Sequence, residues 1–484
     1  MSQALSLDES YEARSGGTLA RVVTITAYSV LGVILCATRL VGLDRGFWHD
    51  EIVAVEGFIR AGPRQILAGP DLSHELFSLL AWSTGSVVGE SEIAYRLWSV
   101  VPFILGVVLV TAWLHVRVNR MSGVLFLFFA TVSPLLLDIT RQARGYGLAF
   151  LAMSVLIVAA LEAERSIRTW TIVAFCAAGL VGTWTLPQFG IAFLATGTVL
   201  LTNRDLRHRA ALGLGVSILS LGAWYAPHIG EVRTAAQIED GIQIDKFWLL
   251  TAPIDQVLIP ALLWIDGTVL VASLVWLPLT LVATLIIGSS PLIRERRTAL
   301  VLVSGVVATV VALWLGRAYV IPRYLSFLLV PLFVLLATGM AAIFARIPAR
   351  PAIIRTVASL VIVGLLAVRF AAIAPDVIRL PREAYKDAAA IILKRGSPSA
   401  PVLAYLRNPE GLEYYLGKPV RALESSEVVA RVCGSREAVV YVIQPFGVKS
   451  VEVPCLGRPG VEHYRVRQYT RGDEMNVWFV PPPA

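Results

Sequence analysis

Long apolar runs separated by short polar connections fill the chain as far as residue 374. A helix needs about 20 residues to cross the roughly 30 Å of hydrocarbon in a bilayer. Eleven runs come near this length: 20–42, 94–116, 121–137, 146–162, 169–185, 187–202, 210–227, 268–289, 298–315, 325–345 and 352–374. The pattern predicts an all-α polytopic membrane protein with about eleven transmembrane helices.

Arginine collects at every second connection between these runs, which sets the predicted orientation. Cytoplasmic loops are enriched in Lys and Arg, so the six clusters are assigned to the inside. They are Arg14 and Arg21; Arg117 and Arg120; Arg165 and Arg168; Arg204, Arg207 and Arg209; Arg294, Arg296 and Arg297; and Arg346, Arg350 and Arg355. The acidic connections, 43–93 and 229–267 among them, are assigned to the outside.

A further apolar segment, 76–89, is too short to span a bilayer. Counting it as a span would also move every later arginine cluster to the outside. It is therefore interpreted as an interfacial or re-entrant helix within the first outer loop, 43–93. The resulting model has a cytoplasmic tail at 1–19, a transmembrane domain at 20–374 with outer loops at 43–93 and 229–267, and an outer domain at 375–484. No small-residue cleavage site follows the first run, which predicts an uncleaved signal anchor.

The sequence changes character in the outer domain, where charges, prolines and short alternating segments replace the apolar runs. Residues 382–395 have the pattern of an amphipathic helix, and 401–405, 438–443 and 475–480 have that of strands. A small α/β domain is predicted.

Composition supports the membrane assignment. The 484 residues are 56% hydrophobic and 16% charged, with a mean hydropathy of +0.70, which is too apolar for a single soluble core. The net charge of +8 is explained by arginines at cytoplasmic helix ends, so no nucleic-acid partner is expected.

The four cysteines divide by environment. Cys36 and Cys176 lie in apolar runs, whereas Cys433 and Cys455 lie in the outer domain. Outside the cytoplasm a disulfide between the latter two can persist, and two separate buried thiols are the alternative.

Charged and aromatic residues gather at the predicted outer helix ends: Asp50, Glu51, His74, Arg96, Arg141, Arg144, Tyr146, Arg323 and Tyr324. This inventory suits sugar transfer from a lipid phosphate, because the leaving phosphate is already anionic and needs no acid to protonate it. One carboxylate takes the proton of the acceptor hydroxyl, and guanidinium groups stabilise the departing phosphate. Arg141 and Arg144 are expected at the start of a helix and on one face of it, where both side chains could bind the same phosphate. Interfacial snorkelling is the alternative for each arginine.

Five motifs, in order, resemble those of the GT-C superfamily of membrane glycosyltransferases. The motifs are Phe47-Trp48-His49-Asp50-Glu51, Ser73-His74-Glu75-Leu76, Gly89-Glu90-Ser91-Glu92-Ile93-Ala94-Tyr95-Arg96-Leu97, Arg141-Gln142-Ala143-Arg144-Gly145-Tyr146-Gly147-Leu148 and Pro322-Arg323-Tyr324-Leu325. The nearest likeness is to the protein O-mannosyltransferase-like family, which includes relatives that modify lipid A with aminoarabinose. It covers about residues 20–345.

The resemblance implies a hexosyl- or pentosyltransferase of mannosyltransferase type in the bacterial cytoplasmic membrane. It implies a polyprenyl-phosphate sugar as donor, outer-face transfer with inversion, and an acceptor protein, lipid or glycan. Asp50 would be the base, with Glu51 orienting it or the acceptor. The implied donor-phosphate residues are Arg96, Arg141, Arg144, Tyr146, Arg323 and Tyr324. The second motif departs from a His-Pro-Pro-Leu-like run by lacking the prolines.

Other interpretations stay open. Asp50 could cap a helix, and Trp48 could belong to an aromatic belt instead of contacting a sugar. His49 and His74 are candidate substrate contacts, or in the case of His74 an interfacial hydrogen-bonding residue. With Asp50 and Glu51 these histidines could surround a divalent metal, although no spacing matches an established metal motif.

Two other classes of function compete with sugar transfer. A transporter of envelope lipids or sugars would have ionisable residues near the midplane of the membrane, whereas the interiors of the predicted spans are nearly free of charge. A non-catalytic envelope scaffold would leave the outer carboxylates solvated and replaceable.

Overall fold

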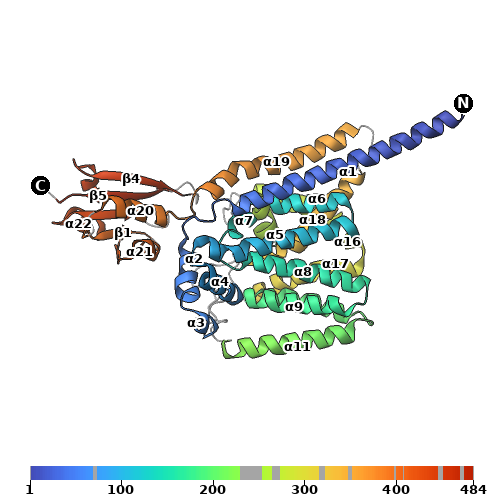
Figure 1. Cartoon of the computed structure of the whole chain (residues 1–484), viewed down its shortest axis with the longest axis horizontal. Coiled ribbons are helices and arrows are strands. Elements are labelled where there is room, and N and C mark those ends of the chain that lie inside the picture. Colours follow the sequence, from blue (N-terminus) through green and yellow to red (C-terminus); the bar gives the residue numbers. More distant parts are fainter. Residues whose placement is uncertain are drawn as a thin grey trace.

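A computed structural model shows a bundle of membrane-type helices with a small α/β domain at one end (Figure 1). The structure describes the chain except for residues 1, 69–73, 229–252, 264–272, 316–321, 347–351, 397–398, 407, 445–450, 469–473 and 483–484. Most of the predicted second outer loop, 229–267, therefore lies outside the described residues. Its described part forms η3 (Pro253–Leu258) and α14 (Ile259–Leu263).

Where the structure describes them, the predicted apolar runs coincide with helix. The bundle helices are α1 (Ser2–Leu40), α5 (Glu92–Arg117), α6 (Arg120–Val132), α7 (Pro134–Ile139), α8 (Tyr146–Arg165), α9 (Thr169–Thr185), α10 (Phe189–Leu201), α11 (Arg207–Tyr225), α15 (Ser273–Gly288), α17 (Arg296–Leu315), α18 (Leu329–Arg346) and α19 (Ala352–Arg379). By length and composition, six helices among the described residues can span a membrane, and four shorter helices are also apolar.

The run at 121–137 is divided between two helices. Ser133 is extended and its side chain accepts a hydrogen bond from the Leu136 N–H, which caps α7, and Pro134 opens that helix. Proline at the first helical position suits this start, because the amide hydrogen it lacks would have no partner within the helix. The break turns the chain toward the end of the bundle where the α/β domain lies.

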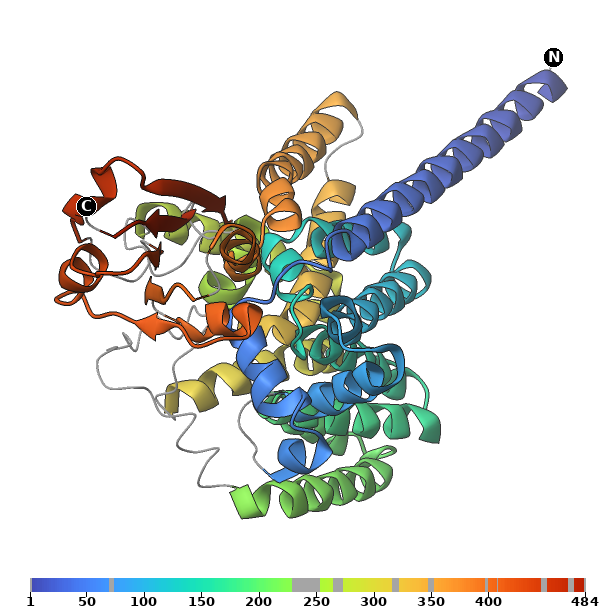
Figure 2. The same cartoon turned by 60° about the vertical axis from the view of Figure 1, so that its left-hand side comes forward.

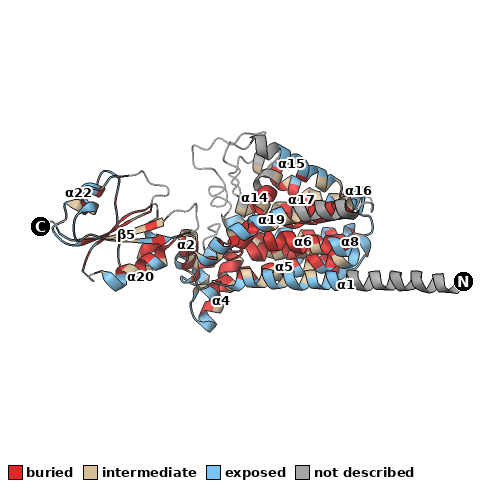
Figure 3. Ribbon diagram, turned by 90° about the horizontal axis from the view of Figure 1, so that it is seen from above, coloured by how far each residue is buried: buried red, intermediate tan, exposed pale blue. Residues whose placement is uncertain are grey.

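Helices α8 and α18 form the centre of the bundle and are buried on nearly all sides, whereas α1 lies at its edge (Figure 3). Close packing of α8 on α5 requires a glycine. A β-carbon on Gly147 would lie 1.8 Å from the Ser99 carbonyl oxygen, closer than atoms can approach. Small residues allow such backbone contact where the bilayer offers no hydrophobic driving force between helices.

The first outer loop is a group of short helices: α2 (His49–Ala54), η1 (Val55–Ile59), α3 (Pro63–Ala68) and α4 (Glu75–Val88). Helix α4 is the predicted short apolar helix at 76–89. It packs on α5, where Gly85 lies against the ring of Tyr95. The loop lies between the bundle and the α/β domain (Figure 2).

The outer domain is a mixed five-stranded sheet in the order β2-β1-β3-β5-β4. Its strands are β1 (Val402–Tyr405), β2 (Arg421–Ala422), β3 (Val439–Ile443), β4 (Glu462–Arg467) and β5 (Glu474–Val480). Strands β1, β2 and β3 are parallel, and β5 runs antiparallel to both β3 and β4. The helices are α20 (Tyr385–Arg395), α21 (Glu410–Leu416) and α22 (Val428–Cys433). A disulfide joins Cys433 to Cys455.

The outer domain docks on the first outer loop. The Phe47 N–H donates to the Tyr415 hydroxyl at 2.6 Å, and the His49 N–H donates to the Glu383 carboxylate at 2.8 Å. The Lys386 ammonium pairs with Glu92 at 2.7 Å. Apolar residues of the loop and of the domain also share one buried cluster. The segment that carries Asp50 is therefore held from the membrane side and from the domain side.

Candidate active site at the outer end of the bundle

The site is organised by the turn that opens α2. Trp48 is extended and stands at the N-cap position, and its N–H donates to the Glu51 carboxylate at 3.2 Å. Asp50 therefore does not cap this helix. His49, a predicted substrate contact, is partly exposed, and its backbone is bound by Glu383.

Asp50 lies between two arginines from distant parts of the chain. Its Oδ2 is 3.0 Å from a guanidinium nitrogen of Arg144 and 2.9 Å from one of Arg323. The three side chains are 23%, 13% and 15% exposed, so the group is accessible but mostly shielded from water. One carboxylate between two guanidinium groups leaves a net positive charge, which suits an anionic ligand. Tyr324, also predicted here, lies beside Arg323: the guanidinium carbon of Arg323 is 5.4 Å from the centre of the Tyr324 ring.

The side chain of His74 is hydrogen-bonded to Arg144. Arg144 Nε donates to His74 Nε2 at 3.2 Å, and the histidine ring packs edge-on against Tyr146 at 4.9 Å. His74 has a φ of 58°, in the left-handed region that few residues other than glycine adopt. Burial, followed by the charge of Arg144, lowers the pKa of His74 well below its usual value. The neutral imidazole is therefore the acceptor that orients Arg144.

This environment predicts a pH dependence of stability. The unfolded chain protonates His74 near pH 6.5, whereas the lowered pKa opposes protonation in the folded protein. Stability from this group is therefore complete above about pH 6.5 and is lost as the pH falls below it, by at most about 1.4 kcal/mol per pH unit. Thermal unfolding in detergent between pH 5 and 7.5 measures the slope. His74→Asn, which tolerates the left-handed backbone, is expected to remove that slope; an unchanged slope would contradict the assignment.

Glu51 and Arg96 form a buried pair beneath the turn. Arg96 Nε and a terminal nitrogen bind the two oxygens of Glu51 at 2.9 and 2.7 Å. The remaining Arg96 donors reach the carbonyls of Leu43, Arg45 and Gly46, and the Ala143 N–H donates to Glu51. Both side chains are almost fully buried. The contacts of Arg96, which belongs to α5, tie the loop to the bundle, and the pair lies apart from the group around Asp50.

Arg141 and Arg144 do not share a helical face, contrary to the expectation from their spacing. They lie in the turn between α7 and α8, because α8 begins only at Tyr146. Arg144 reaches Asp50, whereas Arg141 donates to the carbonyls of Val41 and Gly42 at 2.6 and 3.1 Å. The two arginines are therefore not placed to bind one phosphate together, as their spacing predicted.

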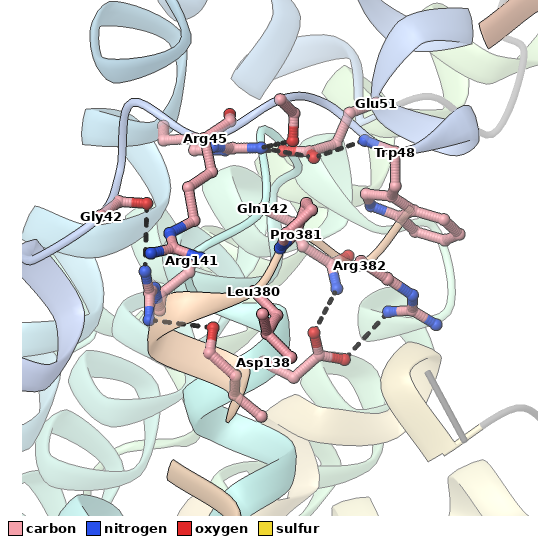
Figure 4. A pocket seen from close by; sticks show the side chains of 13 residues that line it. Gly42, Arg45, Trp48, Glu51, Asp138, Arg141, Gln142, Leu380, Pro381 and Arg382 are labelled. Carbon is pink, nitrogen blue, oxygen red and sulfur yellow. Dashed lines mark hydrogen bonds and ion pairs between the residues drawn. The ribbon is translucent and has the colours of Figure 1, made fainter. Parts of the chain in front are cut away.

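Arg141 belongs to a polar cavity of about 40 Å³ under the Trp48 turn (Figure 4). One charged lining residue of the first outer loop, Arg45, was missed by the sequence analysis. Also missed were Asp138, in α7, and Arg382, in the segment between α19 and α20. Asp138 and Arg382 form an ion pair at 2.9 Å, and Arg382 lies over the Trp48 ring at 4.0 Å. Both are charged residues that follow predicted spans on the side assigned to the outside. That position in the sequence could have identified them as candidates.

Three of the four residues considered for a metal have other partners, whereas Nδ1 of the fourth, His49, has no hydrogen-bond partner among the described residues. Asp50 pairs with two arginines, Glu51 pairs with Arg96, and His74 Nε2 accepts from Arg144. Within the described ranges, no three His, Cys, Asp or Glu side chains come together as metal ligands. The arrangement fits an anion better than a cation.

Comparison with known proteins identifies the fold. No protein-family model and no curated protein matches the sequence. The solved structures with a similar fold include the following three. ArnT from Cupriavidus metallidurans in the apo state aligns with a TM-score of 0.55 at 14% identity, over 96% of this chain and 98% of that one. The same protein bound to undecaprenyl phosphate aligns at 0.50 and 13%, over 94% and 97%. The Archaeoglobus fulgidus oligosaccharyltransferase, in complex with Zn and sulfate, aligns at 0.52 and 12%, over 86% and 67%.

The similarity to ArnT extends over both the helical bundle and the α/β domain, since nearly the whole length of each protein is covered. At such low identity these similarities speak for the arrangement of the chain and not for its chemistry. The protein therefore has the GT-C type of fold that its sequence motifs predict, a polytopic helical membrane domain followed by a small α/β domain.

Proposed function

We propose that this protein transfers a sugar from a polyprenyl-phosphate donor to an acceptor hydroxyl, at the outer face of the bacterial cytoplasmic membrane. The observation that carries the proposal is Asp50 held between Arg144 and Arg323 at the outer end of the bundle. A base and two phosphate-binding cations are thereby within contact distance of one another. The similar fold of ArnT, solved with undecaprenyl phosphate bound, supports a carrier of this kind.

The geometry suggests how the base becomes available. Without donor, Asp50 pairs with both arginines through one oxygen, Oδ2. A donor phosphate offers the arginines several oxygens in place of one, so they can turn to it. Asp50 then loses two cationic partners, and its carboxylate oxygens are free to contact the acceptor hydroxyl. The ligand that brings the sugar would also release the carboxylate that activates the acceptor.

The transfer itself is a single displacement. The acceptor oxygen forms a bond to the anomeric carbon as the bond from that carbon to the phosphate oxygen breaks. The hydroxyl proton passes to Asp50, and the electron pair of the broken bond leaves on the phosphate. Arg144 and Arg323 stabilise this charge. Attack from the face opposite the phosphate inverts the anomeric centre, and a hexosyl or pentosyl donor fits the same scheme.

Other residues of the site are proposed to support these groups. His74 and Tyr146 fix Arg144, and Trp48 lies against both Arg323 and Arg382, at 5.1 and 4.0 Å from their guanidinium carbons. Glu51 and Arg96 hold the loop beneath them. In this scheme Glu51 acts on structure, and Asp50 alone acts as the base.

The arginines provide a direct test of the donor site. Arg144→Gln and Arg323→Gln are each expected to weaken binding of undecaprenyl phosphate by about ten- to a hundredfold, the range for a lost charge-assisted hydrogen bond. Binding is measured by titration of the full-length protein in nanodiscs. The matched control is Arg64→Gln, which removes an equal charge from an exposed position in α3 of the same loop.

Transfer is measured with the same proteins in liposomes, using a set of undecaprenyl-phosphate hexoses and pentoses as donors. Envelope material from a strain lacking the gene supplies acceptors, and mass spectrometry detects the product. Sugar transfer by the wild type that is reduced in both arginine variants and retained in Arg64→Gln supports the proposal. Equal binding and transfer in all four proteins would exclude this donor site.

A further inference from the structure

The cavity under Trp48 is distinct from the group around Asp50. Asp50, Arg144 and Arg323 do not line it, whereas Arg45, Arg96, Arg141 and Arg382 do (Figure 4). It is formed by the first outer loop, the turn before α8 and the segment that leads into the outer domain. All three of these parts meet at the cavity.

The lining carries an excess of positive charge. Four arginines face two carboxylates, Glu51 and Asp138, which gives a net charge of +2. The carboxylates already have cationic partners, Glu51 in Arg96 and Asp138 in Arg382. An anion that enters the cavity therefore meets attraction that the protein's own acids do not cancel.

Three buried polar atoms of the lining have no hydrogen-bond partner among the described residues. They are the donors Arg45 Nε and Trp48 Nε1 and the acceptor Gln142 Oε1. The NH₂ of the Gln142 amide donates to Asp138 at 3.2 Å and so orients the group. The amide oxygen is the atom of this group that has no hydrogen-bond partner among the described residues. Trp48 and Gln142 are 7% and 4% exposed, so water outside the protein does not satisfy these atoms. Buried polar groups are normally paired, which makes this set unusual.

We propose that this cavity is a second oxyanion site, which takes the phosphate of inorganic phosphate or of a phosphate monoester. Its volume of about 40 Å³ has room for such a group and not for a sugar ring. The arginine and indole N–H groups donate to phosphate oxygens. Gln142 Oε1 accepts the P–OH hydrogen of hydrogen phosphate, or of a phosphate monoester in its monoanionic form, a hydrogen that sulfate and phosphodiesters lack near neutral pH.

This chemistry separates the two phosphates of the proposed reaction. The intact donor is a phosphodiester, because its phosphate joins the lipid to the sugar. The carrier released after transfer is a monoester, as is a phosphorylated acceptor. Given the proposed function, the second site would bind one of these two monoesters and would reject the donor.

Titration of the full-length protein in nanodiscs with inorganic phosphate tests the site without any turnover. Saturable binding is expected in the wild type, with sulfate binding at least about tenfold more weakly. Arg45→Gln, at a partly exposed residue, and Trp48→Phe, which keeps an aromatic ring but removes the smaller ring of the indole together with its N–H, are each expected to raise the dissociation constant about tenfold or more. Arg64→Gln, at an exposed residue of α3, should leave phosphate binding unchanged.

The same variants are titrated with undecaprenyl phosphate to identify the source of the monoester. Weaker binding of that lipid by Arg45→Gln assigns the site to the released carrier; an unchanged lipid affinity with weaker inorganic phosphate binding assigns it to a soluble or acceptor-borne phosphate. The site is excluded if phosphate does not bind, if sulfate binds as well, or if Arg144→Gln abolishes binding while Arg45→Gln and Trp48→Phe do not. Loss of the donor site would appear separately, in the Arg144 and Arg323 variants.

Discussion

Asp50→Asn is expected to lower the rate of sugar transfer by about 10²- to 10⁴-fold, the usual contribution of a general base. The amide has nearly the shape of the carboxylate, so the turn and its two arginines keep their places. It cannot take the acceptor proton, and it places no negative charge beside Arg144 and Arg323. Affinity for undecaprenyl phosphate should therefore be kept or increased while transfer is lost. Initial rates and lipid titrations on the same preparation measure the two effects.

Asp44→Asn is the matched control for this variant. Asp44 is an exposed carboxylate in the same loop, six positions before Asp50, and it should be replaceable with full transfer activity. A scaffold or a transporter would have no need of Asp50 as a base. Transfer at the wild-type rate by Asp50→Asn would rule out the assignment of the base, whatever the fold.

The second large effect concerns stability. Arg96→Ala should lower the free energy of unfolding by about 3–5 kcal/mol, because it leaves the Glu51 charge buried without its partner. Three backbone carbonyls lose their donor as well. Glu51→Ala should be destabilising in the same range, since it isolates the Arg96 charge. Equilibrium unfolding of the detergent-solubilised protein, followed by tryptophan fluorescence, measures both changes.

An exposed ion pair of the same loop provides the control. Arg60 binds Glu56 and Glu90 at the surface, so Arg60→Ala should change stability by only about 0–1 kcal/mol. The double variant Glu51→Leu/Arg96→Leu should recover part of the stability lost in either single variant, because no unpaired charge then remains. Single variants as stable as Arg60→Ala would show that the buried pair does not hold the loop.

The outer domain contributes to the site, which the family resemblance did not indicate. Arg382 reaches Asp138 and Trp48 from the segment just before α20, and Glu383 binds the backbone of His49. The loop that carries Asp50 is therefore positioned partly by residues more than 300 positions away along the chain. Changes at this junction should act on the proposed active site through the loop.

The positions of the membrane helices follow from the sequence alone. A span is specified locally, by about 20 apolar residues in a row, and the predicted runs coincide with helix where the structure describes them. The outer-domain segments with clear alternation are the strands β1, β3 and β5. The strands that were not predicted carry weaker signals: β2 has only two residues, and β4 is largely polar and exposed at the sheet edge.

The sequence by itself also determined which residue types are available at the outer helix ends: a carboxylate pair, several arginines and a histidine. Only the tertiary structure decided how they are paired. Asp50 and Glu51 are adjacent, yet one meets Arg144 and Arg323 and the other meets Arg96. Arg141 and Arg144 are three positions apart, yet they serve different places. Which side chains pair depends on where the turn between α7 and α8 and the outer domain pack. Such contacts join residues far apart in the chain and produce no periodic pattern of hydrophobic and polar residues.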